Sequence, residues 1–282
     1  VMADKAQAPG AAPAQQQRIK VGAVRVEGNT LLPERVIAEL TADLAGNERS
    51  MADLNQLATR IQKAYRDAGY GGVVAYVPEQ EISGGTVVIR VIEGKLANVR
   101  VTGNAFFDTA NIRAGLPHLS EGATPVVRDI DRDIQLTNEN PAKEVKVTLT
   151  PGAKQGQIDA DVGVTDSKPL QVLLGYDNTG QEITGRHRVS VGLKHTNLFN
   201  RDQVGTVQYQ TSPEKPGQVH IFSAGYRVPL YSQAASVDAF VAHSSISSGT
   251  TFTPAGPFTF AGKGTIVGVL GNRVLYRLGQ YE

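Results

Sequence analysis

The sequence predicts an α+β first half, built from two small domains of order β-α-α-β-β, followed by an all-β segment of antiparallel strands. Two observations support this. The stretch VRVEGNT begins at Val24, and the similar stretch VRVTGNA begins at Val99, 75 residues later. A fixed period of this length indicates a repeated structural unit. From Leu170 onward helical periodicity disappears, and short segments of alternating apolar and polar residues follow one another.

The composition limits what the protein can be. The chain has 282 residues, a net charge of +1 and no cysteine. A disulfide framework, a thiolate zinc site and a cysteine nucleophile are therefore excluded, and no global field favours nucleic acid. The mean hydropathy is −0.20, and no apolar run reaches the roughly 18 residues of a membrane-spanning helix. A role at a membrane must therefore use strands or the membrane surface.

The first repeat shows the predicted order most clearly. The valines at its start alternate, which predicts a strand with one buried face, and Gly28-Asn29 supplies a turn. Pro33 fits the first position of a helix. Ser50 and Asp53 have the spacing of a capping box at the start of a second helix, which Gly69 ends. The segments GVVAYV (72–77) and TVVIRVI (86–92) follow as two strands.

The second repeat follows the same plan with a shorter second helix. Val126, Ile130 and Ile134 are one turn apart before the segment NENPA breaks the pattern. Residues 145–149 and 158–164 alternate on both sides of PGAKQG, which predicts a hairpin.

These features resemble the POTRA domains of two-partner secretion transporters, the TpsB-type outer-membrane proteins of the ShlB/FhaC/HecB haemolysin secretion/activation family. The duplicated V-R-V-x-G-N start and the segment NENPAKEVKVTLTPGAKQG carry the resemblance, which covers about Ile19 to Asp166. It implies four parts: a flexible lead-in (1–18), a first POTRA domain (19–95), a second POTRA domain (96–167) and the N-terminal part of an outer-membrane β-barrel (168–282).

The last third has the alternation of transmembrane barrel strands. In RVSVGLK, three apolar side chains form one face, and Arg188, Ser190 and Lys194 lie on the other. An arginine or lysine facing lipid near the bilayer midplane would cost about 2–4 kcal/mol. We therefore predict that these three residues line the pore. A soluble antiparallel sandwich is the alternative that this pattern leaves open.

The number of strands predicts an incomplete barrel. About six strands fit between Leu170 and Gly271, whereas the barrels of the family resemble pores of about sixteen strands, and the smallest closed barrels have about eight. An open sheet cannot lie in lipid, where every backbone polar group must be paired. We therefore expect the sequence to be a truncated fragment. The inward-folded loop and the arginine motif of the family would lie in the missing part.

Motifs for catalysis and metal binding are absent. There is no G-x-S-x-G and no P-loop. The five histidines are scattered without an H-x-x-x-H pair, so we expect them at single barrel or loop positions. We predict no enzyme activity, no catalytic residue, no metal and no cofactor.

The resemblance implies a translocator in the Gram-negative outer membrane, with its POTRA domains in the periplasm. Its partners would be outer-membrane lipid and an unfolded secreted exoprotein of the haemolysin, adhesin or toxin type, without nucleic acid. POTRA domains resemble modules that add a strand of the substrate to an exposed sheet edge. The resemblance places this edge at about residues 72–77, with a groove beside it. The partner-binding residues that it nominates are Val74, Tyr76, Ile61 and Tyr65.

Two other functions remain open from the sequence. An outer-membrane protein insertase shares the plan of POTRA domains and a barrel, although two repeats favour the secretion transporter. A soluble periplasmic scaffold is the other alternative. The sequence identifies neither the secreted partner, nor the organism, nor the oligomeric state.

Overall fold

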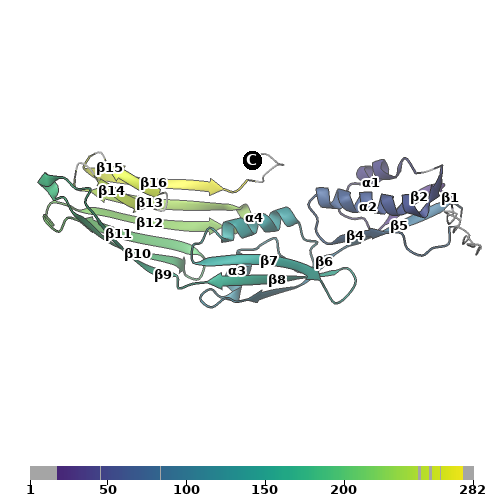
Figure 1. Cartoon of the computed structure of the whole chain (residues 1–282), viewed down its shortest axis with the longest axis horizontal. Coiled ribbons are helices and arrows are strands. Elements are labelled where there is room, and N and C mark those ends of the chain that lie inside the picture. The colour runs from purple at the N-terminus through teal and green to yellow at the C-terminus, as the bar shows by residue number, and fades with distance from the viewer. Residues whose placement is uncertain are drawn as a thin grey trace, which may run out of the picture. The chain divides into compact units, whose positions relative to one another are not determined.

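The computed structural model describes residues 18–44, 46–82, 84–246, 249–253, 256–260 and 262–275. All but the last residue of the predicted lead-in lies outside the described residues. The chain divides into two compact units, one ending at Gly94 and one beginning at Lys95, and each is described by itself. Figure 1 shows the elements of both.

The first unit has the predicted order β-α-α-β-β around a three-stranded sheet. Its elements are β2 (Ala23–Glu27), α1 (Glu34–Thr41), α2 (Met51–Asp67), β4 (Val73–Tyr76) and β5 (Thr86–Glu93). The central strand β5 pairs with β2 in parallel and with β4 in antiparallel orientation. The sequence did not predict the short ribbon of β1 (Arg18–Lys20) and β3 (Glu48–Ser50), whose three-residue strands have no visible alternation.

The helix α2 supplies most of the core of this unit. The predicted capping box is present, because the Ser50 side chain accepts from the Asp53 backbone and the Asp53 carboxylate accepts from the Ser50 backbone. The apolar side of α2 packs against β4, and each large aliphatic side chain buried there stabilises the fold by about 1.5–3 kcal/mol. The buried residues of this helix are Leu54, Leu57, Ala58, Ile61 and Tyr65.

The repeated Gly-Asn pair is explained by a close approach between two backbones. Gly28 and Gly103 both have φ of +86°. A Cβ atom at Gly28 would lie 2.2 Å from the carbonyl oxygen of Val91, and one at Gly103 would lie 2.3 Å from that of Val164. Glycine is therefore required in both repeats, because the chain passes directly over the last strand of its own sheet.

A carboxylate at the end of that last strand fixes the loop after the first glycine. In the first unit, Glu93 Oε1 accepts hydrogen bonds from the backbone of Thr30 at 2.7 Å and of Leu31 at 2.9 Å, and from the hydroxyl of buried Tyr65 at 2.7 Å. Burial alone would raise the pKa of Glu93, but the bonds from Thr30, Tyr65 and Leu31 outweigh it and lower the pKa. The ionised Glu93 carboxylate therefore stabilises the folded unit fully above its unfolded pKa near 4.5. This stabilisation is lost as the pH falls through the lower pKa of the folded state.

The second repeat uses the same device. The Asp166 carboxylate accepts from the backbone of Ala105, Phe106 and Phe107 at 2.8–3.0 Å. The elements of this repeat are β6 (Lys95–Thr102), α3 (Thr109–Ala114), α4 (Val127–Thr137), β7 (Lys143–Pro151) and β8 (Gln157–Asp166). Its sheet has the order β6-β8-β7, so it repeats the topology of the first unit.

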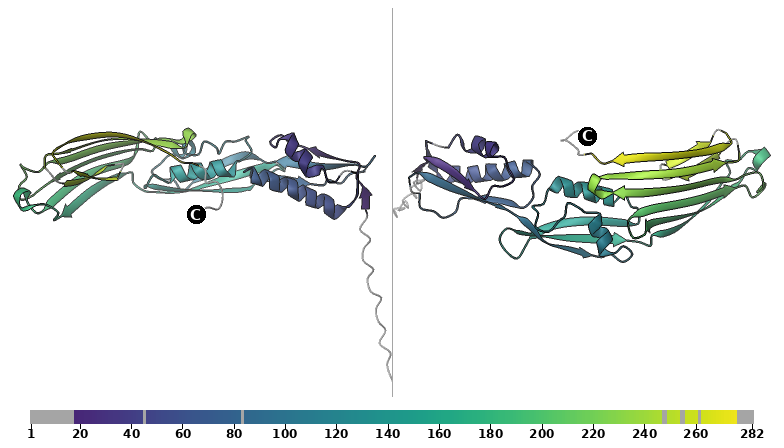
Figure 2. Two further views of the ribbon diagram at one scale, coloured as in Figure 1. Left: turned by 90° about the horizontal axis from the view of Figure 1, so that it is seen from above. Right: turned by 180° about the vertical axis from the view of Figure 1, so that it is seen from behind.

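The last third forms one antiparallel sheet of the six predicted strands, in the order β16-β13-β12-β11-β10-β9. Figure 2 shows this sheet as a curved layer. The strands are β9 (Leu170–Asp177), β10 (Arg188–Leu198), β11 (Gln203–Thr211), β12 (Ile221–Leu230), β13 (Ala235–Ser244) and β16 (Gly264–Arg273). Among the described residues, no helix combines the length and apolar character needed to cross a membrane.

The sequence analysis did not predict the small hairpin of β14 (Gly249–Thr253) and β15 (Gly256–Phe260), which lies between β13 and β16 in the chain. β14 contacts β11, β12 and β13. The backbone carbonyl of Phe252 accepts from the buried Ser223 hydroxyl at 3.0 Å, and the ring centroids of Phe240 and Phe258 are 5.4 Å apart. The hairpin therefore packs on the face of the sheet that carries Ser223.

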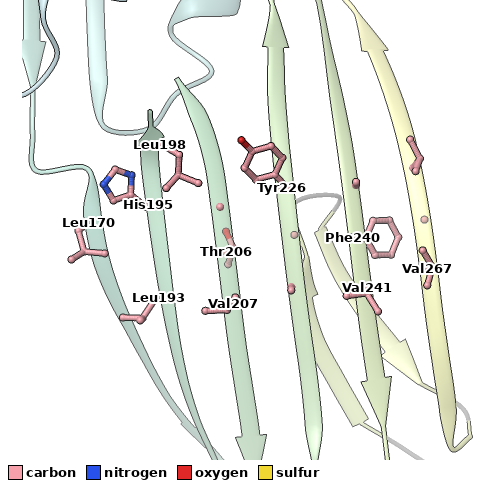
Figure 3. A pocket seen from close by; sticks show the side chains of 16 residues that line it. Leu170, Leu193, His195, Leu198, Thr206, Val207, Tyr226, Phe240, Val241 and Val267 are labelled. Carbon is pink, nitrogen blue, oxygen red and sulfur yellow. The ribbon is translucent and has the colours of Figure 1, made fainter. Parts of the chain in front are cut away.

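The large sheet has one apolar and one polar face. The register places one apolar side chain from each strand in a continuous row across the sheet, and Figure 3 shows part of this row. The row consists of Val172, Leu193, Val207, Ala224, Val241 and Val267. Side chains of the opposite face include those of Ser190, Gln208, Ser223 and Asp238.

We predict that Gly28→Ala destabilises the segment 18–94 more than Gly46→Ala does. The core of this unit is formed by its own residues, so the segment is suited to urea unfolding. Both glycines have positive φ, but a Cβ at Gly46 meets nothing within 4 Å. Backbone strain costs about 1–2 kcal/mol at either position, and the clash with Val91 adds about 1–3 kcal/mol at Gly28. Equal losses for the two variants would contradict the close-approach explanation.

Candidate functional site

The strand β4 lies at a free edge of the first sheet, as the sequence analysis predicted. Among the strands that the structure describes, it pairs with β5 only. Val73 and Ala75 face the core, whereas Val74, with 49% of its surface exposed, and Tyr76 point to the opposite side of the sheet. Pro78 follows two residues later and removes a backbone donor. The unpaired side of β4 is therefore a short template of about four residues for another extended chain.

The four nominated partner-binding residues do not line one groove. Ile61 and Tyr65 lie on α2 with 0% exposure, within the core of the unit. The Tyr65 hydroxyl is hydrogen-bonded to Glu93 and to Asn29. Burial raises the pKa of Tyr65, and the bond to Glu93 adds to this rise. Both side chains therefore hold the domain together. Val74 and Tyr76 are the two that a partner can reach without opening the core, and their role in binding stays a prediction.

The free edge is limited by a side chain beyond Pro78. The amide of Gln80 accepts from the backbone N–H of Val88 at 2.7 Å and donates to its carbonyl at 2.8 Å. Gln80 thereby takes the place that a longer β4 would occupy beside β5. The accessible backbone is confined to β4 itself.

The three predicted pore residues share the polar face of the large sheet. Ser190 lies opposite Gln210, and Lys194 lies opposite Gln171 and Thr206. Arg188 is on the same face but is 4% exposed. Its guanidinium donates to the carbonyl of Gly185 at 2.6 Å and to the hydroxyl of Thr184 at 2.9 Å. Arg188 therefore holds the β9–β10 loop, and Lys194 is the more exposed cation of the pair.

A buried polar cluster joins the second repeat to the large sheet. The ammonium of Lys143, at the start of β7, is fully buried, donates to Asn111 Oδ1 at 3.0 Å and forms an ion pair with Asp202. Asp202 lies between β10 and β11 and also accepts from the Tyr231 hydroxyl at 2.5 Å. Burial lowers the pKa of Lys143, and the nearby Asp202 carboxylate offsets part of this effect. We call the cluster of five residues the joint: Asn111, Asn140, Lys143, Asp202 and Tyr231.

The amides of the joint satisfy the backbone of the β10–β11 turn. Asn140 Nδ2 donates to the carbonyl of Thr196 at 2.8 Å. Asn111 Nδ2 donates to the carbonyl of Asn200 at 2.9 Å and to Asn197 Oδ1 at 3.1 Å. Removal of the Asn140 amide would leave the buried carbonyl of Thr196 without this donor, which costs about 1–3 kcal/mol. The joint therefore fixes the second repeat against the turn.

The sequence analysis did not identify the joint. It treated NENPA as the end of a helix and as part of the family resemblance, and it assigned no functional role to NLFNRD (197–202). The structure shows that Asn138 pairs with both backbone groups of Val145, at 2.7 and 3.0 Å, while Asn140 and Lys143 reach the turn. The available signal was the concentration of amides in both segments, since such side chains pair with backbone groups.

No group of histidine, cysteine, aspartate and glutamate side chains among the described residues is arranged to hold a metal ion. The buried Asp133 carboxylate instead contacts His118, with Nδ1 at 3.0 Å. Burial raises the pKa of Asp133, and the bonds from His118 reduce this shift.

Comparison with protein-family models gives two matches to one family. The POTRA domain model of ShlB type matches residues 19–94. The model of the haemolysin secretion/activation protein ShlB/FhaC/HecB matches residues 156–282. The chain belongs to the ShlB/FhaC/HecB family. Its α/β repeats are POTRA domains, and its large sheet is the first part of the outer-membrane β-barrel.

Relatives with curated names are outer-membrane or haem transporters. The chain is 27% identical over 176 residues to the outer membrane transporter CdiB of Dickeya dadantii, which covers 62% of this chain and 31% of that protein. It is 29% identical over 164 residues to the heme/hemopexin transporter protein HuxB of Haemophilus influenzae, which covers 57% of this chain and 29% of that protein. The matched region thus spans about a third of the length of these relatives.

A solved structure agrees with the fold. CdiB from Escherichia coli superposes with a TM-score of 0.70 and 21% identity, covering 92% of this chain and 47% of that one. The likeness supports a fold of POTRA-type repeats followed by barrel strands.

We predict that Lys143→Met loosens the joint because it leaves the Asp202 carboxylate buried without its counter-charge. The expected cost is about 3–5 kcal/mol. The double variant Lys143→Met/Asp202→Asn should recover most of it, because a neutral amide still accepts from Tyr231. The measurement is amide hydrogen exchange of α3 and residues 197–202 in the complete protein in detergent.

Lys146→Met is the matched control, since Lys146 lies on the same strand with 80% of its side chain exposed. Exchange that is unchanged in Lys143→Met, or raised equally by Lys146→Met, would contradict the role of the buried pair.

Proposed function

We propose that this chain is the periplasmic and first barrel portion of a two-partner secretion translocator that captures an unfolded exoprotein on β4 and exports it through the barrel. The observation that carries the proposal is the free edge of β4 in a domain of ShlB type. An unfolded chain presents backbone donors and acceptors whatever its sequence, so pairing with an edge strand suits a long and variable substrate.

The surface beside β4 supports this mode of binding. On the face away from the helices, Val74 lies opposite Ile92 and Tyr76 lies opposite Arg90. A strand added along β4 would place alternate side chains beside Val74 and Tyr76, and such cross-strand pairs contribute about 0.2–1 kcal/mol each. The contacts are individually weak, which allows a translocating chain to move on.

The polar face of the barrel sheet supports export through a wet pore. Ser190, Gln208 and Lys194 offer polar groups along neighbouring strands, while the apolar row faces the opposite way. The hairpin of β14 and β15 packs on this polar face and narrows the space beside it. A polar polypeptide would pass along this face without being exposed to lipid.

The insertase alternative shares the architecture, but both matched models describe the secretion family. The soluble-scaffold alternative does not account for the apolar row. The names of the transporter relatives CdiB and HuxB favour the secretion function.

The double variant Val74→Asp/Tyr76→Ala should weaken binding of the unfolded N-terminal segment of the exported exoprotein by about tenfold, or 1.4 kcal/mol. It removes two side chains that flank an added strand and places a charge at the edge, which disfavours pairing. Binding is measured by titration calorimetry with residues 18–94, and export is measured with the complete protein in cells.

The matched control is Arg25→Asp/Glu27→Ala on β2, the other edge strand of the same sheet, where both side chains are also accessible. This pair should leave binding unchanged. Equal losses from the two pairs, or no loss from the β4 pair in a folded domain, would contradict capture on β4.

A further inference from the structure

Three histidines lie on the apolar face of the barrel sheet, at the strand ends opposite the one where Leu170 begins β9. His187 directly precedes β10, His220 directly precedes β12, and His243 lies on β13. The second POTRA domain enters the sheet at Leu170, so that end of the strands faces the periplasm. The opposite end, where the histidines lie, faces the outside of the cell.

Each of two histidines contacts a tyrosine on the preceding strand. The Tyr176 hydroxyl lies 2.6 Å from His187 Nδ1, and the two rings are stacked with centroids 5.6 Å apart. The Tyr209 hydroxyl lies 2.7 Å from His220 Nδ1. A phenol that donates to Nδ1 fixes the tautomer that carries its proton on Nε2.

The third histidine, His243, contacts a threonine hydroxyl in place of a tyrosine hydroxyl. The Thr265 hydroxyl on β16 lies 2.8 Å from His243 Nδ1, and His243 lies opposite Phe222 in the register. Three hydroxyl–imidazole pairs therefore occur in succession across six strands. We call them the histidine band: His187, His220 and His243 with Tyr176, Tyr209 and Thr265.

Two outer nitrogens of the band are available to a ligand, and the third lies near a carboxylate. His187 Nε2 lies 3.6 Å from Glu214 Oε1, and its side chain is 41% exposed. Within the described part of the chain, we find no hydrogen-bond partner for Nε2 of His220 or His243, and both side chains are exposed. The band thus presents N–H donors where the strands leave the hydrocarbon.

The loops around the band carry slightly more positive than negative charge. Arg186 and Lys263 are exposed, Lys215 is half-buried and donates to the carbonyl of Ile183 at 2.7 Å, and Glu182 and Glu214 are the nearby carboxylates. Both carboxylates are engaged: Glu182 lies 3.7 Å from the guanidinium of Arg186, and Glu214 accepts from the backbone of Arg186 at 2.5 Å. Asp177 is bonded to Thr179 and Gln210 on the polar face. The band therefore faces lipid without an unpaired carboxylate beside it.

We propose that the histidine band binds the phosphate groups of the phosphorylated glycolipid in the outer leaflet, the lipid A part of lipopolysaccharide. Phosphate is an anion that only accepts hydrogen bonds at its charged oxygens, and it matches a row of N–H donors and neighbouring cations. Directly below the band, Leu174 and Val191 lie opposite each other on the apolar face, where they meet the acyl chains of the same lipid. The band then fixes the depth of the barrel at the outer leaflet.

The periplasmic end of the same face differs. His195 Nδ1 accepts from the backbone of Asn197 at 3.2 Å, and the Tyr226 hydroxyl donates to Gln203. No hydroxyl–imidazole pair forms there among the described residues. His195 therefore provides a control of the same residue type, on the same face, in the opposite leaflet.

The test uses the complete protein in detergent and measures binding of three probes by native mass spectrometry: diphosphorylated lipid A, dephosphorylated lipid A and phosphatidylglycerol. The wild type should bind diphosphorylated lipid A at least about tenfold more tightly than the dephosphorylated form. The triple variant His187→Phe/His220→Phe/His243→Phe keeps a ring at each position and removes the nitrogens, so this preference should disappear. His195→Phe should leave it unchanged.

Equal binding of the two lipid A forms by the wild type would overturn the proposal, and this result does not depend on any variant folding. A preference that survives in the folded triple variant, or that His195→Phe abolishes as well, would also overturn it. Phosphatidylglycerol binding as tight as that of diphosphorylated lipid A would show an unspecific contact with anionic lipid.

Discussion

The pairing of backbone hydrogen-bonding groups is the constraint on which the structure depends. In the large sheet, the four inner strands β10, β11, β12 and β13 have hydrogen-bonded neighbours on both sides, as lipid requires because it offers no partner for a free N–H or C=O. The POTRA domains lie in water, where an unpaired edge is tolerated, and β4 keeps one. The same rule therefore requires paired strands in the part of the chain that lies in lipid and permits an unpaired edge in the part that would meet a substrate.

Where regular strand pairing stops, charged and amide side chains form hydrogen bonds with the remaining backbone groups. Glu93 and Asp166 hold the loops that cross over their own sheets, Gln80 covers the end of β5, and the joint covers the β10–β11 turn. A buried ion pair such as that of Lys143 and Asp202 adds little stability compared with an apolar pair, but it tolerates few other arrangements. The joint thus defines how the second POTRA domain meets the barrel turn.

The elements with strong periodicity could be predicted from the sequence. The capping box at Ser50, the helix end at Gly69 and the six long barrel strands all appear as expected. The β14–β15 hairpin and the β1–β3 ribbon could not be predicted, because strands of three to five residues carry too little alternation. Ile61 and Tyr65 show the limit of reasoning from a family resemblance. The resemblance nominated both for a groove beside β4, but the packing shows that both side chains are buried in the core.

Side-chain networks between distant segments were the least predictable feature. Lys143 and Asp202 are 59 residues apart, and neither lies in a pattern that indicates burial. The histidines looked scattered in the sequence because antiparallel pairing, and not sequence spacing, brings His187 next to Tyr176 and His220 next to Tyr209. Such sites become visible only when the strand register is known.

The most direct test of the central claim is amide hydrogen exchange, resolved residue by residue by NMR, of isotope-labelled residues 18–94 with and without the unfolded N-terminal segment of the exoprotein. Capture by strand addition predicts new protection confined to the outward-facing amides of β4, with cross-strand contacts between the two backbones. Protection that appears on α1, α2 or β2 while the β4 amides exchange as before would contradict it.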